Sequence, residues 1–89
     1  MNDRIPSQNS QYRLEHMDGE VLLYNPANTK AVYLNETSSL IWNLCDGDRT
    51  IETIVTLLKE CFPDSESSIT DDVLLTLDDF ANHGAIDYR

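Results

Sequence analysis

The sequence predicts an α+β fold, with a three-stranded antiparallel β-meander followed by three helices. Residues 12–34 contain alternating or continuous apolar runs bounded by turn residues, which is typical of strands. From residue 36 onward the apolar residues recur at helical spacing instead. Strands that precede the helices as a group are typical of α+β domains, and a chain of 89 residues provides one hydrophobic core.

The meander is predicted from two turn signals. Asp18-Gly19 suits a two-residue type I′ turn between a strand at residues 12–17 and a strand at residues 21–24. Residues 25–28, Asn-Pro-Ala-Asn, form the second turn because proline presets φ and asparagine tolerates the left-handed region. Residues 30–34 are then the third strand. In this order the second strand is central, so the third strand is an open edge.

The first helix follows the third strand directly and is expected to end at Gly47. Asn35 is its predicted N-cap, since the side-chain oxygen can accept a backbone N–H of the first turn. Glu36 then places negative charge at the positive end of the helix dipole. The apolar residues gather in one stripe, which consists of Leu40, Ile41, Leu44 and Cys45.

Two further helices are predicted. The second spans about residues 51–62, with Thr50 as its N-cap and Pro63 after its end. The third begins near residues 68–70 and ends at His83, because Gly84 suits the left-handed C′ position. Residues 85–88 form either a short closing strand or a tail.

The first two helices outline a helix-turn-helix pair joined by residues 46–50, which favours a winged-helix-like packing. DNA binding would require Lys or Arg side chains on the phosphates. The predicted third helix has no basic residue and carries four aspartates, Asp71, Asp72, Asp78 and Asp79. We therefore expect no nucleic-acid partner.

Residues 1–11 are polar, so we expect a flexible N-terminal arm before a single domain over residues 12–89. This arm has no apolar segment of the kind found in signal peptides. No apolar run in the chain approaches the ~18 residues of a membrane span. We expect a cytoplasmic protein with no membrane partner.

Charge is the strongest compositional signal. Sixteen acidic residues against six basic ones give a net charge of −10, and no Lys or Arg lies between Lys59 and Arg89. One interpretation is a self-repelling, soluble surface, and the other is a surface that attracts a basic partner. Composition leaves both open.

Neither catalysis nor metal binding is indicated. The sequence contains no GxSxG, HExxH, Walker A or GxGxxG pattern. Cys45 and Cys61 are far apart in the chain, and His16 and His83 have no ligand-like neighbours. We expect a protein that is not an enzyme and has no cofactor.

Two features favour peptide binding. The open third strand can pair with an extended peptide. On a helical wheel of the third helix, Leu75 lies between Asp71, Asp79 and Asn82, and Leu74 borders it next to Asp78. Exposed leucines are common, but a leucine pair rimmed by carboxylates also suits a groove for an apolar and basic peptide.

Two stretches of the sequence resemble the PqqD-like family. They are LNETSSLIWNLCDGDRTIETIV, residues 34–55, and DDVLLTLDDFANHGAI, residues 71–86, and the resemblance extends over about residues 21–86. Members of this family are small winged-helix-like modules, also called RiPP precursor peptide recognition elements. The chain departs from the family's Tyr-Pro-Glu type motif at residues 24–27, which read Tyr-Asn-Pro-Ala, and this departure favours a broader PqqD-like assignment over the quinone pathway itself.

The resemblance implies a peptide chaperone that binds the leader of a ribosomally made precursor and delivers it to a modifying enzyme, often a radical-SAM protein. The leader would add as a strand to the third strand and lie against the third helix. The expected peptide-binding residues are Lys30, Ala31, Val32, Tyr33, Leu34, Asp71, Leu74, Leu75 and Asp78. The alternative hypothesis is a winged-helix-type adaptor or transcription regulator that binds protein. Either a monomer or a dimer paired through the edge strand is compatible with the sequence.

Overall fold

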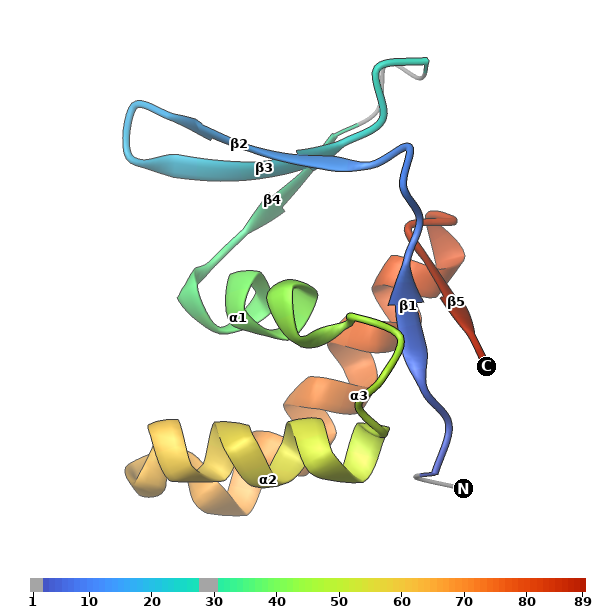
Figure 1. The fold of residues 1–89 in the computed structure, drawn as a ribbon. Coiled ribbons are helices and arrows are strands. Elements are labelled where there is room, and N and C mark those ends of the chain that lie inside the picture. Colours follow the sequence, from blue (N-terminus) through green and yellow to red (C-terminus); the bar gives the residue numbers. More distant parts are fainter. Residues whose placement is uncertain (1–2, 28–30) are drawn as a thin grey trace.

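The computed structural model describes residues 3–27 and 31–89 and confirms the α+β fold (Figure 1). Five strands are present in these ranges: β1 (Pro6–Gln8), β2 (Arg13–Met17), β3 (Glu20–Tyr24), β4 (Ala31–Leu34) and β5 (Ile86–Tyr88). The helices are α1 (Glu36–Leu44), α2 (Ile51–Cys61) and α3 (Glu66–Asn82), with a 3-10 turn, η1 (Pro63–Ser65), before α3. Of the two alternatives left open for residues 85–88, the structure shows the closing strand, which is β5. The end of the predicted second turn, residue 28, and Lys30 lie outside the described residues.

The meander has the predicted antiparallel order β2–β3–β4. Met17 pairs with Glu20, and Asp18 and Gly19 between them have φ of 52° and 81°. Positive φ at both central residues is the signature of a type I′ turn. β3 is central, so β4 is an edge strand of this sheet.

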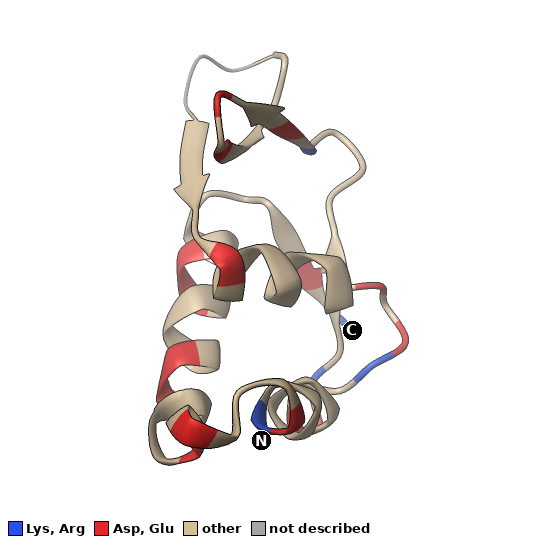
Figure 2. Cartoon of the chain, turned by 90° about the vertical axis from the view of Figure 1, so that its left-hand side faces the viewer, with Lys and Arg blue, Asp and Glu red and all other residues tan. Residues whose placement is uncertain are grey.

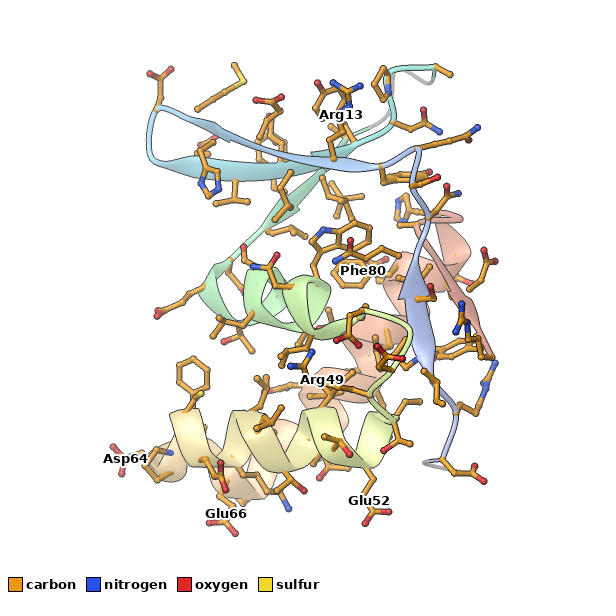
Figure 3. All side chains as sticks on the ribbon, viewed as in Figure 1. Arg13, Arg49, Glu52, Asp64, Glu66 and Phe80 are labelled. Carbon is orange, nitrogen blue, oxygen red and sulfur yellow. The ribbon has the colours of Figure 1, made fainter. Side chains whose placement is uncertain are left out.

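One face of the meander lies over the helices, and the other faces solvent. Leu23 is completely buried, and its cross-strand neighbours Leu14 and Val32 pack against the core from the same face. Side chains one position away point to the opposite face. Arg13 accordingly projects from the outer side of the sheet (Figure 3).

The core lies between the meander and the three helices. α1 runs beneath the sheet, and α2 packs against α3 below it (Figure 1). The rings of Trp42 and Phe80 meet edge to face, with centroids 5.6 Å apart, so α1 and α3 are joined under the sheet. Figure 3 shows Phe80 in this central position.

The predicted N-caps of the first two helices are confirmed. Asn35 Oδ1 accepts the Ser38 N–H at 2.8 Å, and Ser38 Oγ accepts the Asn35 N–H at 2.9 Å, which forms a reciprocal capping box. Thr50 Oγ1 accepts the Thr53 N–H at 3.1 Å. The Asn35 cap fixes the point at which β4 turns into α1.

The ends of the helices differ in part from the prediction. α1 stops at Leu44 rather than at Gly47, because the following chain pairs with the N-terminus: the Gly47 N–H donates to Pro6 O at 3.1 Å. α3 starts at Glu66, ahead of the predicted 68–70, since η1 leads directly into it. Gly84 ends α3 as predicted, with a φ of 77°.

The expectation of a flexible arm over residues 1–11 is wrong for residues 6–8, which form β1 and pair with β5. Pro6 is fully buried. Gln8 donates its backbone N–H to Cys45 O at 3.0 Å and its side-chain Nε2 to Trp42 O at 2.7 Å. The carbonyl groups at the end of α1 lack partners within the helix, and Gln8 of β1 donates hydrogen bonds to them. These bonds fix β1 against the domain.

No helix in the described ranges is both long and apolar enough to cross a lipid bilayer.

Candidate functional site

A cleft of about 350 Å³ opens between β4 and α3. Its walls come from two elements and the turn that joins β4 to α1: Val32, Tyr33, Leu34, Asn35, Ser38, Leu75, Thr76, Asp79 and Phe80. A second cleft of about 260 Å³ shares Asn35, Ser38, Leu75 and Thr76 with the first and extends to Thr37 and Asp72. We call the two clefts together the β4–α3 groove.

The two walls of the groove run in opposite directions. Where β4 forms one wall, Asp79 and Phe80 form the other. Farther along the groove, the first turn of α1 forms the first wall in place of β4, and Asp72 lies opposite it. Leu75 lines both clefts and is therefore at the middle of the groove.

The hairpin turn determines which backbone groups of β3 face β4. Residues that flank a two-residue turn, here Met17 and Glu20, exchange both backbone hydrogen bonds, and such pairs recur at every second position. The intervening residues of β3, Val21 and Leu23, therefore direct their N–H and C=O groups away from β2 and toward β4.

The same alternation identifies the open groups of β4. Leu34 and Val32 pair with Val21 and Leu23, so their backbone groups point inward to β3. The N–H and C=O groups of Ala31 and Tyr33 point to the outer edge. Within the described ranges, no loop or turn forms a backbone hydrogen bond with them. β4 thus offers two residues with which another strand could pair.

The packing of α3 against the core determines which of its residues form the wall opposite β4. Val73, Leu77 and Phe80 are buried in the core and orient the helix. The groove-lining residues of α3 form a neighbouring stripe at helical spacing, Asp72, Leu75, Thr76 and Asp79. Leu75 is 68% exposed although it is a leucine. Its side chain contributes little to the core and remains open to a partner.

The structure brings together four of the expected site residues. Val32, Tyr33 and Leu34 line the groove from β4, and Leu75 lines it from α3. Ala31 is exposed at the start of β4, next to the groove. Lys30 lies outside the described residues.

The remaining expected residues, Asp71, Leu74 and Asp78, are not among those that line the groove. Asp78 is instead close enough to Tyr88 of β5 for its charge to act on the phenol. Leu74, which is 38% exposed, falls on the other flank of the core stripe from Leu75 because adjacent helical residues point about 100° apart. The leucine pair is therefore not one patch.

Sequence reasoning missed Asp72, Thr76 and Asp79 on α3, and Asn35 and Ser38 at the start of α1. The expected stripe of residues 71, 74, 75 and 78 and the observed stripe of residues 72, 75, 76 and 79 have the same spacing and differ by one position. Only the side on which β4 packs distinguishes them, and no local pattern contains that information.

The electrostatic character of the groove is acidic. Asp72 and Asp79 line it, and both are exposed. Among the ion pairs of the described residues, one involves these carboxylates: Asp79 Oδ1 lies 3.7 Å from His83 Nδ1. Acidic residues recur along α3, whereas the Lys and Arg residues that the structure describes lie outside this helix (Figure 2).

No cysteine and no histidine are among the described residues that line the groove. Burial, together with the charge of Asp46, raises the pKa of the Cys45 thiol to about 12, so this cysteine is protonated and acts as a core residue. In the part of the chain that the structure describes, no three His, Cys, Asp or Glu side chains are grouped so that they could hold a metal ion. The arrangement of an open strand edge beside an apolar and acidic groove is suited to binding.

Comparisons with known proteins are consistent with this geometry. Residues 20–86 match the model of a family described as coenzyme PQQ synthesis protein D (PqqD), and this segment includes both walls of the groove. Over 73 residues the chain is 34% identical to a PqqA binding protein of Pseudomonas putida (strain W619), a match that covers 79% of this chain and 76% of that relative. No solved structure matches the chain.

Proposed function

The chain belongs to the PqqD family, and on that premise we propose that it is a non-enzymatic protein that binds the leader of a precursor peptide by β-strand addition. The observation that carries this proposal is the open edge of β4 beside the groove. An extended peptide would pair with Ala31 and Tyr33 and place alternate side chains against α3. The name of the relative in Pseudomonas putida, PqqA binding protein, supports a peptide as the ligand.

In strand addition, β4 and α3 would have different roles in binding the peptide. Backbone pairing supplies affinity without sequence selectivity, and pockets for alternate side chains supply the selectivity. An apolar side chain of the peptide would cover Leu75, Val32 and Leu34 at the middle of the groove. Polar side chains on the other face of the added strand would remain in solvent.

We further propose that the bound leader is presented to a separate modifying enzyme, such as a radical-SAM protein. No cysteine lines the groove among the described residues, and the Ser38 hydroxyl is engaged in the capping box with Asn35. A bound strand would occupy the β4–α3 groove and leave the peptide beyond the groove accessible to an enzyme. The class of enzyme follows from the resemblance to PqqD-like proteins and not from the groove itself.

A proline substitution tests strand addition at Tyr33. Proline lacks the N–H and is tolerated on edge strands where that N–H faces solvent. Tyr33→Pro removes the outward donor and leaves the pairing of Val32 and Leu34 with β3 in place. Tyr33→Thr is the matched control, because it removes the same aromatic ring and keeps the N–H.

Calorimetry with synthetic PqqA of Pseudomonas putida, and with each short peptide encoded beside this chain's gene, measures the result. We expect at least one of these peptides to bind, Tyr33→Thr to retain most of its affinity, and Tyr33→Pro to lose roughly tenfold or more. Circular dichroism checks that both variants are folded. Equal affinity of folded Tyr33→Pro and Tyr33→Thr would rule out pairing at this residue, and binding of none of the peptides would refute the proposal as a whole.

A further inference from the structure

Resting on the proposed peptide-binding function, we infer which peptide the groove selects. The occupant is a basic segment in which an apolar side chain is flanked, two positions away on each side, by Lys or Arg. The apolar side chain covers Leu75, and the two basic side chains reach Asp79 and Asp72. The β4–α3 groove is thus selective for charge as well as for an extended backbone.

The two carboxylates lie at different ends of the groove. Asp79 belongs only to the cleft beside β4, and Asp72 belongs only to the cleft beside the first turn of α1. Leu75 belongs to both. A strand that follows the groove therefore passes one carboxylate, then the leucine, then the other carboxylate.

The distance between the two carboxylates suits side chains on one face of an extended peptide. Asp72 and Asp79 are seven residues apart, about 10.5 Å along the helix at a rise of ~1.5 Å per residue. Three successive side chains on one face of a strand span about 13 Å, at a rise of ~3.3 Å per residue. The outer two side chains of such a set are slightly farther apart than the carboxylates. Lys and Arg have long, flexible stems that bridge a difference of this size.

Within the described ranges, neither Asp72 nor Asp79 is paired with a Lys or Arg side chain. Among residues 3–27 and 31–89, no ion pair joins a Lys or Arg to α3, and the ion pair of Asp79 is with His83, which is charged only when protonated. The net charge of −10 adds a long-range field of the same sign. A basic peptide relieves this repulsion, and an acidic peptide adds to it.

The same charges disfavour a second copy of this chain as the occupant. Pairing two β4 edges would bring a second α3, with the same carboxylates, alongside the first. The uncharged side chains of Ala31, Val32, Tyr33 and Leu34 provide nothing to compensate that repulsion. An extended basic peptide is therefore the occupant to which we commit.

The test uses two synthetic heptapeptides. Both have leucine at the fourth position and threonine elsewhere, except that the second and sixth positions are lysine in one and glutamate in the other. Threonine favours extended structure, and this design puts the charged side chains on the same face as the leucine. Titration is followed by NMR of the isotope-labelled full chain at low ionic strength, and the amide shifts of β4 and α3 report where each peptide binds.

Two double variants provide matched proteins. Asp72→Asn with Asp79→Asn removes the carboxylates that line the groove. Asp71→Asn with Asp78→Asn removes two carboxylates with the same spacing on the same helix, outside the groove. Both pairs change the net charge equally, so the comparison separates local contacts from the general field.

We expect the lysine peptide to bind at β4 and α3 at least tenfold more tightly than the glutamate peptide, and this preference to shrink with added salt. The variant at residues 72 and 79 should lose roughly fivefold to tenfold in affinity for the lysine peptide, and the variant at residues 71 and 78 less than twofold. Equal binding of the two peptides at β4, or equal losses in the two variants, would overturn the charge selectivity and leave strand addition standing. If neither peptide shifts the amides of β4, both the selectivity and strand addition at this edge are overturned.

Discussion

Tyr33 and Leu75 line opposite walls of one cleft, and the two residues are 70% and 68% exposed. One lies on the edge strand β4, and the other on the helix α3 that faces it. Large apolar side chains with this exposure contribute little to folding where they stand. Their shared position beside an unpaired strand edge indicates a surface that is completed by a partner.

Leu75→Lys should weaken peptide binding with little effect on stability. Covering a leucine fully contributes roughly 1.5–3 kcal/mol, so loss of part of that contact predicts about a tenfold decrease in affinity, measured by calorimetry with the peptide that binds the wild-type chain. The free energy of unfolding should change by less than about 0.5 kcal/mol, as for other exposed positions. Leu74→Lys introduces the same charge outside the groove and serves as the control. Unchanged affinity of Leu75→Lys would remove this residue from the site.

Gln8→Ala should destabilise the fold, because residue 8 belongs to β1 and not to a flexible arm. The variant loses the hydrogen bond from Gln8 Nε2 to Trp42 O, which is 2.7 Å long and partly buried. Such a bond contributes about 1 kcal/mol, and chemical denaturation measures the difference. Gln11→Ala is the control, since the side chain of Gln11 is exposed. Equal stability of Gln8→Ala and Gln11→Ala would show that the Gln8 side chain does not stabilise the end of α1.

Asp46 should make the stability of the domain sensitive to acid. Hydrogen bonds from the backbone N–H groups of Asp48 and Arg49, together with the charge of Arg49, hold the pKa of the Asp46 carboxyl below its ordinary value of 3.8. A group whose pKa is lower in the folded chain stabilises the fold above the unfolded value, and this contribution is lost as the pH falls through the folded value.

Thermal unfolding of the wild type and of Asp46→Ala over a range of pH measures this contribution. The difference in melting temperature should be constant above about pH 5 and should shrink steadily below about pH 4, because the carboxyl is protonated first in the unfolded chain and, at lower pH, in the folded chain. Asp46→Asn keeps an oxygen that accepts the two N–H groups, and it separates the charge from the hydrogen bonds. A difference between wild type and Asp46→Ala that did not change with pH would show that the carboxylate charge has no role.

Local signals predicted much of the fold. The type I′ turn at Asp18-Gly19, the caps at Asn35 and Thr50, and the stop at Gly84 each depend on residues close in sequence, and each is confirmed. β1 could not be predicted in this way. Its strand is three residues long, and its partner β5 lies at the opposite end of the chain. Only the assembled fold shows that the carbonyl groups at the end of α1 require it.

The sequence predicted a candidate site on α3 that is shifted by one residue from the stripe that lines the groove. The open edge of β4 follows from the meander order, and Leu75 follows from its position on the polar side of α3. The choice between Asp71 and Asp72, or between Asp78 and Asp79, depends on which flank of α3 faces β4. That relation is set by the packing of Val73, Leu77 and Phe80 in the core, which involves residues that are distant in sequence.

Amide hydrogen exchange of β4 shows directly whether a peptide adds to this strand as a neighbouring strand. The backbone N–H groups of Val32 and Leu34 point to β3 and should be protected with or without peptide, whereas those of Ala31 and Tyr33 point to the open edge. Strand addition predicts that exchange at Ala31 and Tyr33 slows markedly when the peptide binds, while Val32 and Leu34 change little. Unchanged exchange at Ala31 and Tyr33 in a saturated complex would contradict the account, because a peptide bound elsewhere on the domain leaves these two groups exposed to solvent.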